Sequence, residues 1–199
     1  VFRWYRDASL TDFAFQGPIF TSPALTLTTK YYVTVSGTNA CANDVVSAKV
    51  ITVTVNRNAG VTDIISADET ICSGTNTQLT ASSATVTGNP VFTWYRDAAL
   101  TDVAFVGDKM PVSGLAATTK FYVTVKGDGV CANLPGSAKV VTVNVNPLPN
   151  VPIISTTGTA ICSGNTTVLT IQNPQTGVIY EWYTAATGGT LVNTGISFP

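Results

Sequence analysis

Four cysteines carry the most distinctive chemistry in this sequence. Cys41 and Cys131 stand in the motif CAN, whereas Cys72 and Cys162 stand in ICSG, and the spacing within each class is 90 residues. Cysteines at fixed places in small β-rich domains typically form disulfides in an oxidising compartment. A zinc site would need close CxxC pairs together with histidine, and the sequence has neither. The cysteines are therefore disulfide candidates.

Acid–base chemistry has few candidates. The sequence has no histidine, the commonest general base and metal ligand. Paired carboxylates can act in catalysis or bind calcium through six to eight oxygens, but no oxygen-dense loop of the DxDxDG type occurs. We expect the carboxylates to cap turns, and calcium between repeats is a minor alternative. The carboxylates concerned are Asp7, Asp12, Asp68, Glu69, Asp97 and Asp102.

Nucleophilic chemistry also lacks support. A serine or threonine nucleophile needs a base beside it, and no histidine or Ser-Lys motif provides one. The sequon at Asn165 is interpreted as a coincidence. We therefore expect no catalytic residue, no cofactor, no metal site and no enzymatic activity.

Charge and hydropathy exclude further classes. Charged residues make up only 11% and the net charge is −1, so no basic surface for nucleic acid or an anionic membrane is expected. No apolar run approaches the eighteen or so residues that span a bilayer.

The elements that must position these residues recur along the chain. VFRWYRDASLTD at 1–12 returns as VFTWYRDAALTD at 91–102, and a weaker copy begins at Ile179. A step near 90 residues matches a whole small domain. We expect one tryptophan to fill the core of each repeat. These are Trp4, Trp94 and Trp182.

Alternation of apolar and polar residues predicts strands at 30–35, 49–55, 120–125 and 139–145. Each pair forms a hairpin with a long, turn-rich tip. With the segments upstream, the complete repeat holds about seven short strands, which favours a two-sheet antiparallel sandwich.

Three domains follow from this rhythm. Residues 1–56 hold only late strands, residues 59–146 a complete domain, and residues 151–199 only early strands. The linkers NRNAG and NPLPNVP are short, and the second contains three prolines, which favours an extended connection. We expect a rod, cut from a longer repetitive chain. Head-to-tail completion between copies is a minor alternative.

The motifs ICSG, WY, TTKFYVTV and GVCAN, followed by a closing strand that ends in NP, resemble a known family. It comprises the immunoglobulin-like and PKD-like repeats of very large secreted surface proteins of Bacteroidota, including gliding-motility-associated adhesins. The third copy, WYTAATGGTLVNTG, is especially similar to it. The resemblance implies an all-β fold of tandem immunoglobulin-like antiparallel β-sandwich domains, export to the cell surface, and a stalk, filament or adhesin without catalytic residues. The first two copies read WYRDAxLTD in place of the family's Gly-Gly turn.

Two disulfide arrangements stay open at this point. Cys72 and Cys131 are 59 residues apart in one repeat, so a bridge within the repeat is the simple arrangement. In immunoglobulin order, however, they lie near turns at opposite ends of the sandwich, and a bridge needs Cα atoms within about 7 Å. The alternative joins the first turn of one repeat to the hairpin tip of the next. Free thiols are the third possibility.

The leading hypothesis is a structural module of an extracellular, cell-surface rod. Its expected partners are the neighbouring repeats and, in a fibre, other copies of the chain. One alternative is that the repeats bind a surface glycan or matrix by avidity, with Tyr5, Tyr95 or Tyr183 stacking on sugar, although cross-strand packing of these rings is favoured. The other is an accessory stretch of a secreted hydrolase.

Overall fold

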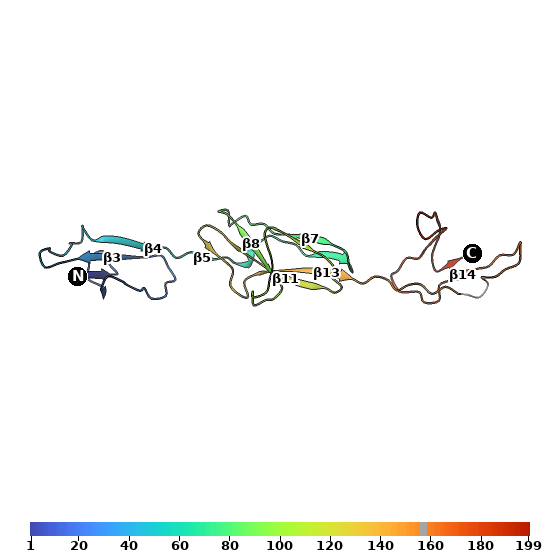
Figure 1. Ribbon diagram of the computed structural model, residues 1–199, viewed down its shortest axis with the longest axis horizontal. Coiled ribbons are helices and arrows are strands. Elements are labelled where there is room, and N and C mark those ends of the chain that lie inside the picture. The colour runs from blue at the N-terminus through green and yellow to red at the C-terminus, as the bar shows by residue number, and fades with distance from the viewer. Residues whose placement is uncertain (156–158) are drawn as a thin grey trace.

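The computed structural model describes residues 1–155 and 159–199. Within these ranges the chain is all-β, apart from one turn of 3₁₀ helix, η1, at Val61–Asp63. Figure 1 shows three units in a row along the longest axis, with the N-terminal unit at one end and the C-terminal unit at the other.

The second repeat contains two facing sheets. A five-stranded sheet has the order β6-β13-β11-β8-β9, in which β6 and β13 are parallel and the other neighbours antiparallel. A two-stranded sheet pairs β7 with β10. The five strands are β6 (Glu69–Cys72), β8 (Val91–Tyr95), β9 (Val103–Val106), β11 (Thr119–Lys126) and β13 (Lys139–Asn146), and the facing pair is β7 (Thr77–Thr80) and β10 (Lys109–Val112).

The core lies between these sheets because alternate side chains of each strand point inward. Val123 and Val125 of β11 and Val141 and Val143 of β13 are fully buried. Trp94 of β8 has no exposed surface, and its indole Nε1 donates a hydrogen bond to the Gly107 carbonyl at 3.0 Å. A large apolar ring is thereby buried without losing a partner for its polar atom. The facing sheet adds Leu79, Met110 and Val112.

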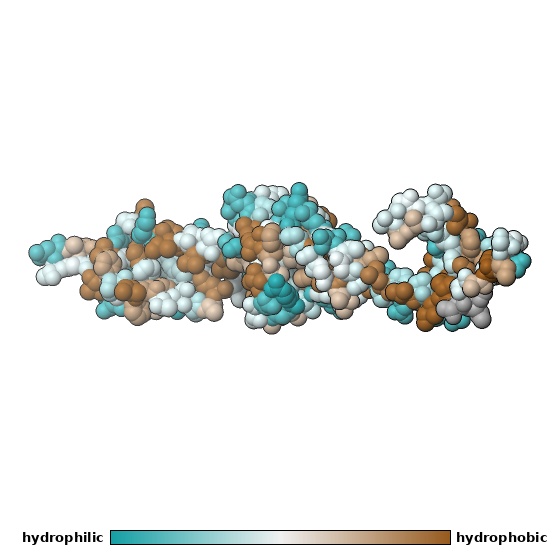
Figure 2. All heavy atoms as spheres, turned by 45° about the vertical axis from the view of Figure 1, so that its right-hand side comes forward, coloured by the Kyte–Doolittle hydropathy of each residue, from teal (hydrophilic) through white to brown (hydrophobic). Residues whose placement is uncertain are grey.

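The first repeat is a single sheet of order β2-β1-β3-β4. No counterpart of β7 is present among these residues, so no second sheet covers the inner face, and only the Phe20 ring packs there on Trp4 and Tyr31. Trp4, expected to be a core residue, is therefore only partly buried, and Phe15, which lies opposite it, is 41% exposed. Figure 2 shows hydrophobic residues on the surface of the N-terminal unit. The strands are β1 (Phe2–Tyr5), β2 (Phe13–Gln16), β3 (Thr29–Val35) and β4 (Lys49–Val53).

The third repeat, in its described part, forms two small sheets that pair β14 with β17 and β15 with β16. Trp182 is likewise only partly buried. It keeps the same polar contact as the other two tryptophans, donating to the Gly195 carbonyl at 2.9 Å. The strands are β14 (Leu169–Thr170), β15 (Glu181–Tyr183), β16 (Leu191–Thr194) and β17 (Ser197–Phe198).

The all-β prediction is confirmed. The four strands expected from alternation are β3, β4, β11 and β13, and each pair is joined through a long tip. The shared spacing reflects a shared register, since Tyr31 lies opposite Ile51 in the first repeat as Phe121 lies opposite Val141 in the second.

Candidate functional site

The recurring carboxylates cap turns. Asp97 accepts hydrogen bonds from the Thr101 and Asp102 amides at 3.0 and 2.8 Å and from the Thr101 hydroxyl at 2.7 Å. These bonds, led by the one from the Asp102 amide, lower the pKa of Asp97 below its ordinary value. Asp7 makes the same contacts in the first repeat.

This cap replaces the glycine turn of the third copy. Leu100 adopts a left-handed backbone with φ of 61°, and Leu10 does the same with φ of 57°. The position is occupied in the third copy by Gly188, with φ of 68°. Arg96, which donates to Asp102 at 2.9 Å, closes the loop from the other side. The first two copies therefore keep the turn shape while changing its chemistry.

No described residues form a metal site. Within residues 1–155 and 159–199, no three acidic or cysteine side chains gather closely enough to hold a metal ion. Asp68, one of the acidic pair considered for calcium, instead accepts the Thr142 amide at 2.8 Å.

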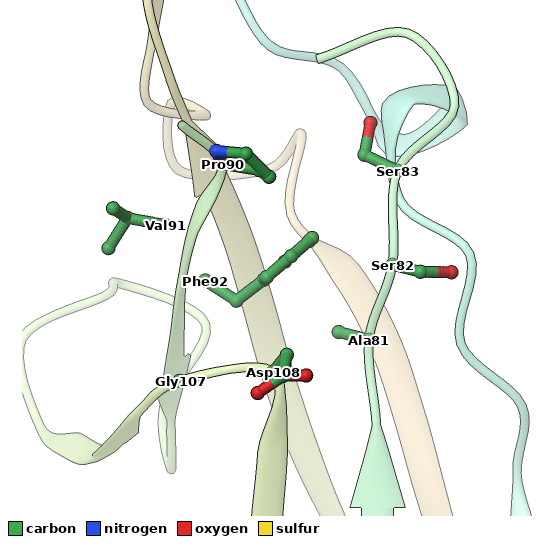
Figure 3. A pocket seen from close by; sticks show the side chains of 8 residues that line it. All are labelled: Ala81, Ser82, Ser83, Pro90, Val91, Phe92, Gly107 and Asp108. Carbon is green, nitrogen blue, oxygen red and sulfur yellow. The ribbon is translucent and has the colours of Figure 1, made fainter. Parts of the chain in front are cut away.

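The hollow shown in Figure 3 is lined mainly by small and apolar residues. Its one titratable group is Asp108, and the Phe92 ring points toward the segment that carries Ala81 and Ser82. Ser82 points away from Phe92, and the Ser83 hydroxyl accepts the Val86 amide at 3.0 Å. The hollow is lined by Ala81, Ser82, Ser83, Pro90, Val91, Phe92, Gly107 and Asp108.

A further set of polar contacts lies where the first linker meets the second repeat. The linker strand β5 (Arg57–Asn58) pairs in parallel with β12 (Val130–Cys131), at the tip of the β11–β13 hairpin. The Ala59 amide, next along the chain, donates to the Cys131 carbonyl at 2.9 Å. The linker is thus an added strand on the second repeat.

An ion pair fastens the same linker. The two terminal guanidinium nitrogens of Arg57 donate to the Asp63 carboxylate, at 2.7 and 3.0 Å. Asp63, 6% exposed, also accepts the Gly60 amide at 2.8 Å and the Thr85 hydroxyl. The bonds from Arg57, then Gly60 and Thr85, lower the pKa of Asp63 well below its usual range. A bidentate pair with its remaining acceptor sites filled fixes direction as well as position.

The second linker is fastened by side-chain amides. Asn173 accepts the Ile153 amide at 2.6 Å and donates to the Val151 carbonyl at 3.3 Å. Gln175 accepts the Asn150 amide and donates to the Asn150 carbonyl, both at 3.0 Å. Both linkers therefore dock onto the repeat that follows them, through different chemistry.

The four cysteines are exposed and unbridged. Cys72 lies opposite Asn146, where the second repeat ends, whereas Cys131 lies opposite Asn58, where it begins. The eight residues of β13 between these ends span about 25 Å, far beyond the reach of a disulfide. A bridge between Cys72 and Cys131 within the repeat is incompatible with this fold.

The sequence reasoning missed the residue that shapes the hairpin tip. Asn133, 5% exposed, accepts the Val125 amide at 2.8 Å and donates to the Ser137 carbonyl at 2.7 Å. Asn43 makes the same two contacts in the first repeat, with the Val35 amide and the Ser47 carbonyl. The available signal was the asparagine of the repeated CAN motif.

Two of the three tyrosines considered for sugar stacking pack across strands. Tyr95 lies opposite Tyr122 of β11, and the ring of Tyr5 meets Phe13 edge to face at 6.0 Å. Tyr183 is 53% exposed, and its hydroxyl donates to the Glu181 carboxylate at 2.7 Å, which raises the pKa of Tyr183.

In the described ranges, the chain contains no helix with the length and apolar character needed to cross a membrane.

Comparison with known families gives three matches to one model, described as an Ig-like domain that is CHU_C associated. The matches span residues 1–56, 61–147 and 149–199. No curated protein matches the chain.

Among solved structures, the crystal structure of DIP-gamma IG1+IG2 is 15% identical. The match covers 72% of this chain and 82% of that one, with a TM-score of 0.32. A chimeric titin Z1Z2-Z1Z2 tandem, functionalised with a GRGDS peptide from fibronectin, is 12% identical. It covers 73% of this chain and 84% of that one, also with a TM-score of 0.32.

Proposed function

The chain belongs to the family of CHU_C-associated Ig-like domains, and from this membership we propose that it is a load-bearing stretch of an extracellular, cell-surface stalk or filament. Ig-like domains of this kind fit a structural repeat module. The partners of each repeat are its neighbours along the chain. Catalysis has no part in this role.

The observation that carries the proposal is the docking of both linkers. Arg57 and Asp63 fasten the first linker to the second repeat, and Asn173 and Gln175 fasten the second linker to the third repeat. Junctions of this kind restrict bending between neighbouring repeats. Freely swinging repeats would need only an unattached linker.

The strand order of the second repeat suits tension along the chain. β6, near the start of the repeat, and β13, at its end, are parallel neighbours, paired from Val143–Glu69 to Asn146–Cys72. Pulling the two chain ends apart slides these strands along each other. Their hydrogen bonds are then loaded together, in shear, because they lie across the direction of pull.

Stretching a single molecule of the chain tests this role. We expect Ser73→Pro to lower the unfolding force of the second repeat, because proline cannot donate the hydrogen bond that the Ser73 amide makes to the Asn146 carbonyl at the end of the β6–β13 ladder. Ala98→Pro is the matched control for chain stiffening away from this ladder, since Ala98 is exposed and follows Asp97 in the turn that the Leu100 amide closes on the Asp97 carbonyl. An equal loss of force in both variants would contradict shear loading.

Location and binding are tested separately. We expect antibody against the second repeat to label intact cells that carry the full protein. Labelling restricted to broken cells would overturn the extracellular role. Strong retention on an array of surface glycans would instead favour the binding alternative.

A further inference from the structure

The second repeat has one cysteine of each class, and each of the two lies beside a linker. Cys72 lies opposite Asn146, the last residue of β13, and the Ser73 amide donates to the Asn146 carbonyl at 2.8 Å. Cys131 lies opposite Asn58, and its carbonyl accepts the Ala59 amide. One thiol therefore stands at the exit of the repeat and the other at its entrance.

The 90-residue spacing brings the two classes to one junction. KVITVTVN at 49–56 corresponds to KVVTVNVN at 139–146, so Asn56 is the counterpart of Asn146. An ICSG cysteine in the repeat before would lie beside Asn56, as Cys72 lies beside Asn146. Asn56 and Asn58 are two residues apart, which is at most about 7 Å along an extended chain, and paired strands lie about 5 Å apart.

We propose that a disulfide joins the ICSG cysteine of each repeat to the CAN cysteine of the next repeat. Cys131 then pairs with the ICSG cysteine of the repeat before its own, and Cys72 with the CAN cysteine of the repeat after its own. Closure requires Cα atoms within about 7 Å, so the bond selects one bend between neighbouring repeats. The proposal rests on the proposed extracellular role, because the bond persists only in an oxidising compartment.

The structure presents both thiols for this reaction. All four cysteines are exposed, while Asn133, two residues beyond Cys131, is buried and anchors the tip. A docked linker and an anchored tip hold the Cys131 backbone at the junction.

The oxidation is an ordinary thiol–disulfide exchange. The thiolate of one cysteine attacks the disulfide of an external oxidant, which is a thiol oxidoreductase or a small disulfide, and displaces one of its sulfurs as a thiolate. The second cysteine thiolate attacks the mixed disulfide and displaces the other sulfur. Two thiols become one S–S bond, and the oxidant, which takes up their two electrons and two protons, is reduced to two thiols.

The bond changes how far the rod extends. With a bridge at both junctions, the second repeat is held at Asn58 and Cys131 on one side and at Cys72 and Asn146 on the other. The shorter covalent paths between the two sides, 58–72 and 131–146, then limit its extension to about 15 residues. An unbridged repeat pays out all 90. At about 3.5 Å per residue, the limits are roughly 50 Å with both bridges and roughly 300 Å without them.

Peptide mapping of the full-length protein, alkylated before any reduction and digested with trypsin, tests the pairing. Cys72 falls in the peptide 58–96 and Cys131 in the peptide 127–139. We expect each to be joined to a peptide from a neighbouring repeat. A bond between these two peptides within one molecule, or alkylated thiols at both, would overturn the proposal.

Cell fractionation separates this failure from failure of the proposed function. If the protein is exposed on the cell surface but its thiols are alkylated, the proposed disulfide is wrong and the proposed rod function is unaffected. Protein retained in a reducing cytoplasm overturns the extracellular role itself. As a second readout, stretching the oxidised protein should give extensions of about one-sixth of those after reduction, and equal extensions would contradict the bridge.

Discussion

At the scale of single residues, each repeated tryptophan acts together with a glycine that accepts its hydrogen bond. Each indole Nε1 donates to a glycine carbonyl 13 residues later, in all three repeats. The glycine has a positive φ each time, for example 142° at Gly107. A Cβ added at Gly107 would meet the Phe105 ring at 2.9 Å. The polar contact survives even where the sandwich is not closed around the ring, which shows that it is local.

The left-handed leucine gives a prediction at this scale. Leu100 holds a φ of 61° that is unfavourable for any side chain and worst for a β-branched one. We expect Leu100→Val to lower the free energy of unfolding by about 1–2 kcal/mol, whereas Leu100→Gly, which reproduces the residue of the third copy, costs less than 1 kcal/mol. Urea unfolding followed by Trp94 fluorescence measures both. Equal losses would show that the turn does not strain the backbone.

At the scale of elements, the β11–β13 hairpin depends on a buried amide side chain. Asn133 satisfies the Val125 amide and the Ser137 carbonyl from one position. The alternation of β11 and β13 explains their pairing, but not why the tip between them is held to one shape.

Removing that amide tests the hairpin. We expect Asn133→Ala to lower the free energy of unfolding by about 1–3 kcal/mol, because it leaves the buried Val125 amide without an acceptor. Asn43→Ala is the matched control, since the same contacts are exposed in the first repeat and water can replace them. Similar losses for the two variants in thermal unfolding would argue against burial as the cause.

At the scale of the whole molecule, the junctions determine whether the repeats act as one rod. The Arg57–Asp63 pair contributes most when both groups are charged. The pKa of Asp63 is lowered in the folded chain, so its stabilising contribution is complete above the ordinary carboxyl pKa of about 4 and is lost as the pH falls through the lowered value.

This linkage predicts a pH-dependent junction. We expect Asp63→Asn to lower the stability of the second repeat at pH 7 and to reduce the further loss between pH 7 and pH 3, because the variant has no carboxylate to protonate. Arg57→Lys keeps the charge but removes the bidentate geometry, and it should retain part of the pH dependence. Urea titrations at both pH values measure these differences. An unchanged pH dependence in Asp63→Asn would mean that other carboxylates, such as Asp7 and Asp97, account for it.

The sequence by itself determined the features that depend on short-range patterns of residues or on repetition along the chain. Alternation from Lys120 to Val125 predicted β11, the spacing of Trp4 and Trp94 predicted a repeated domain, and the aspartates of the WYRD turns were expected to be caps. These features depend on side chains a few residues apart or on identity between copies, so they can be read along the chain.

What only the tertiary structure decided are the contacts between distant segments. Cys72 could be assigned to the exit of its repeat only once β6 was seen to pair with Asn146, and Asp63 drew attention only once Arg57 and Thr85 converged on it. The partial burial of Trp4 likewise follows from the absence of a covering sheet rather than from its own motif. Such contacts depend on how the strands are ordered in space, and alternation within one strand does not specify which strand lies beside it.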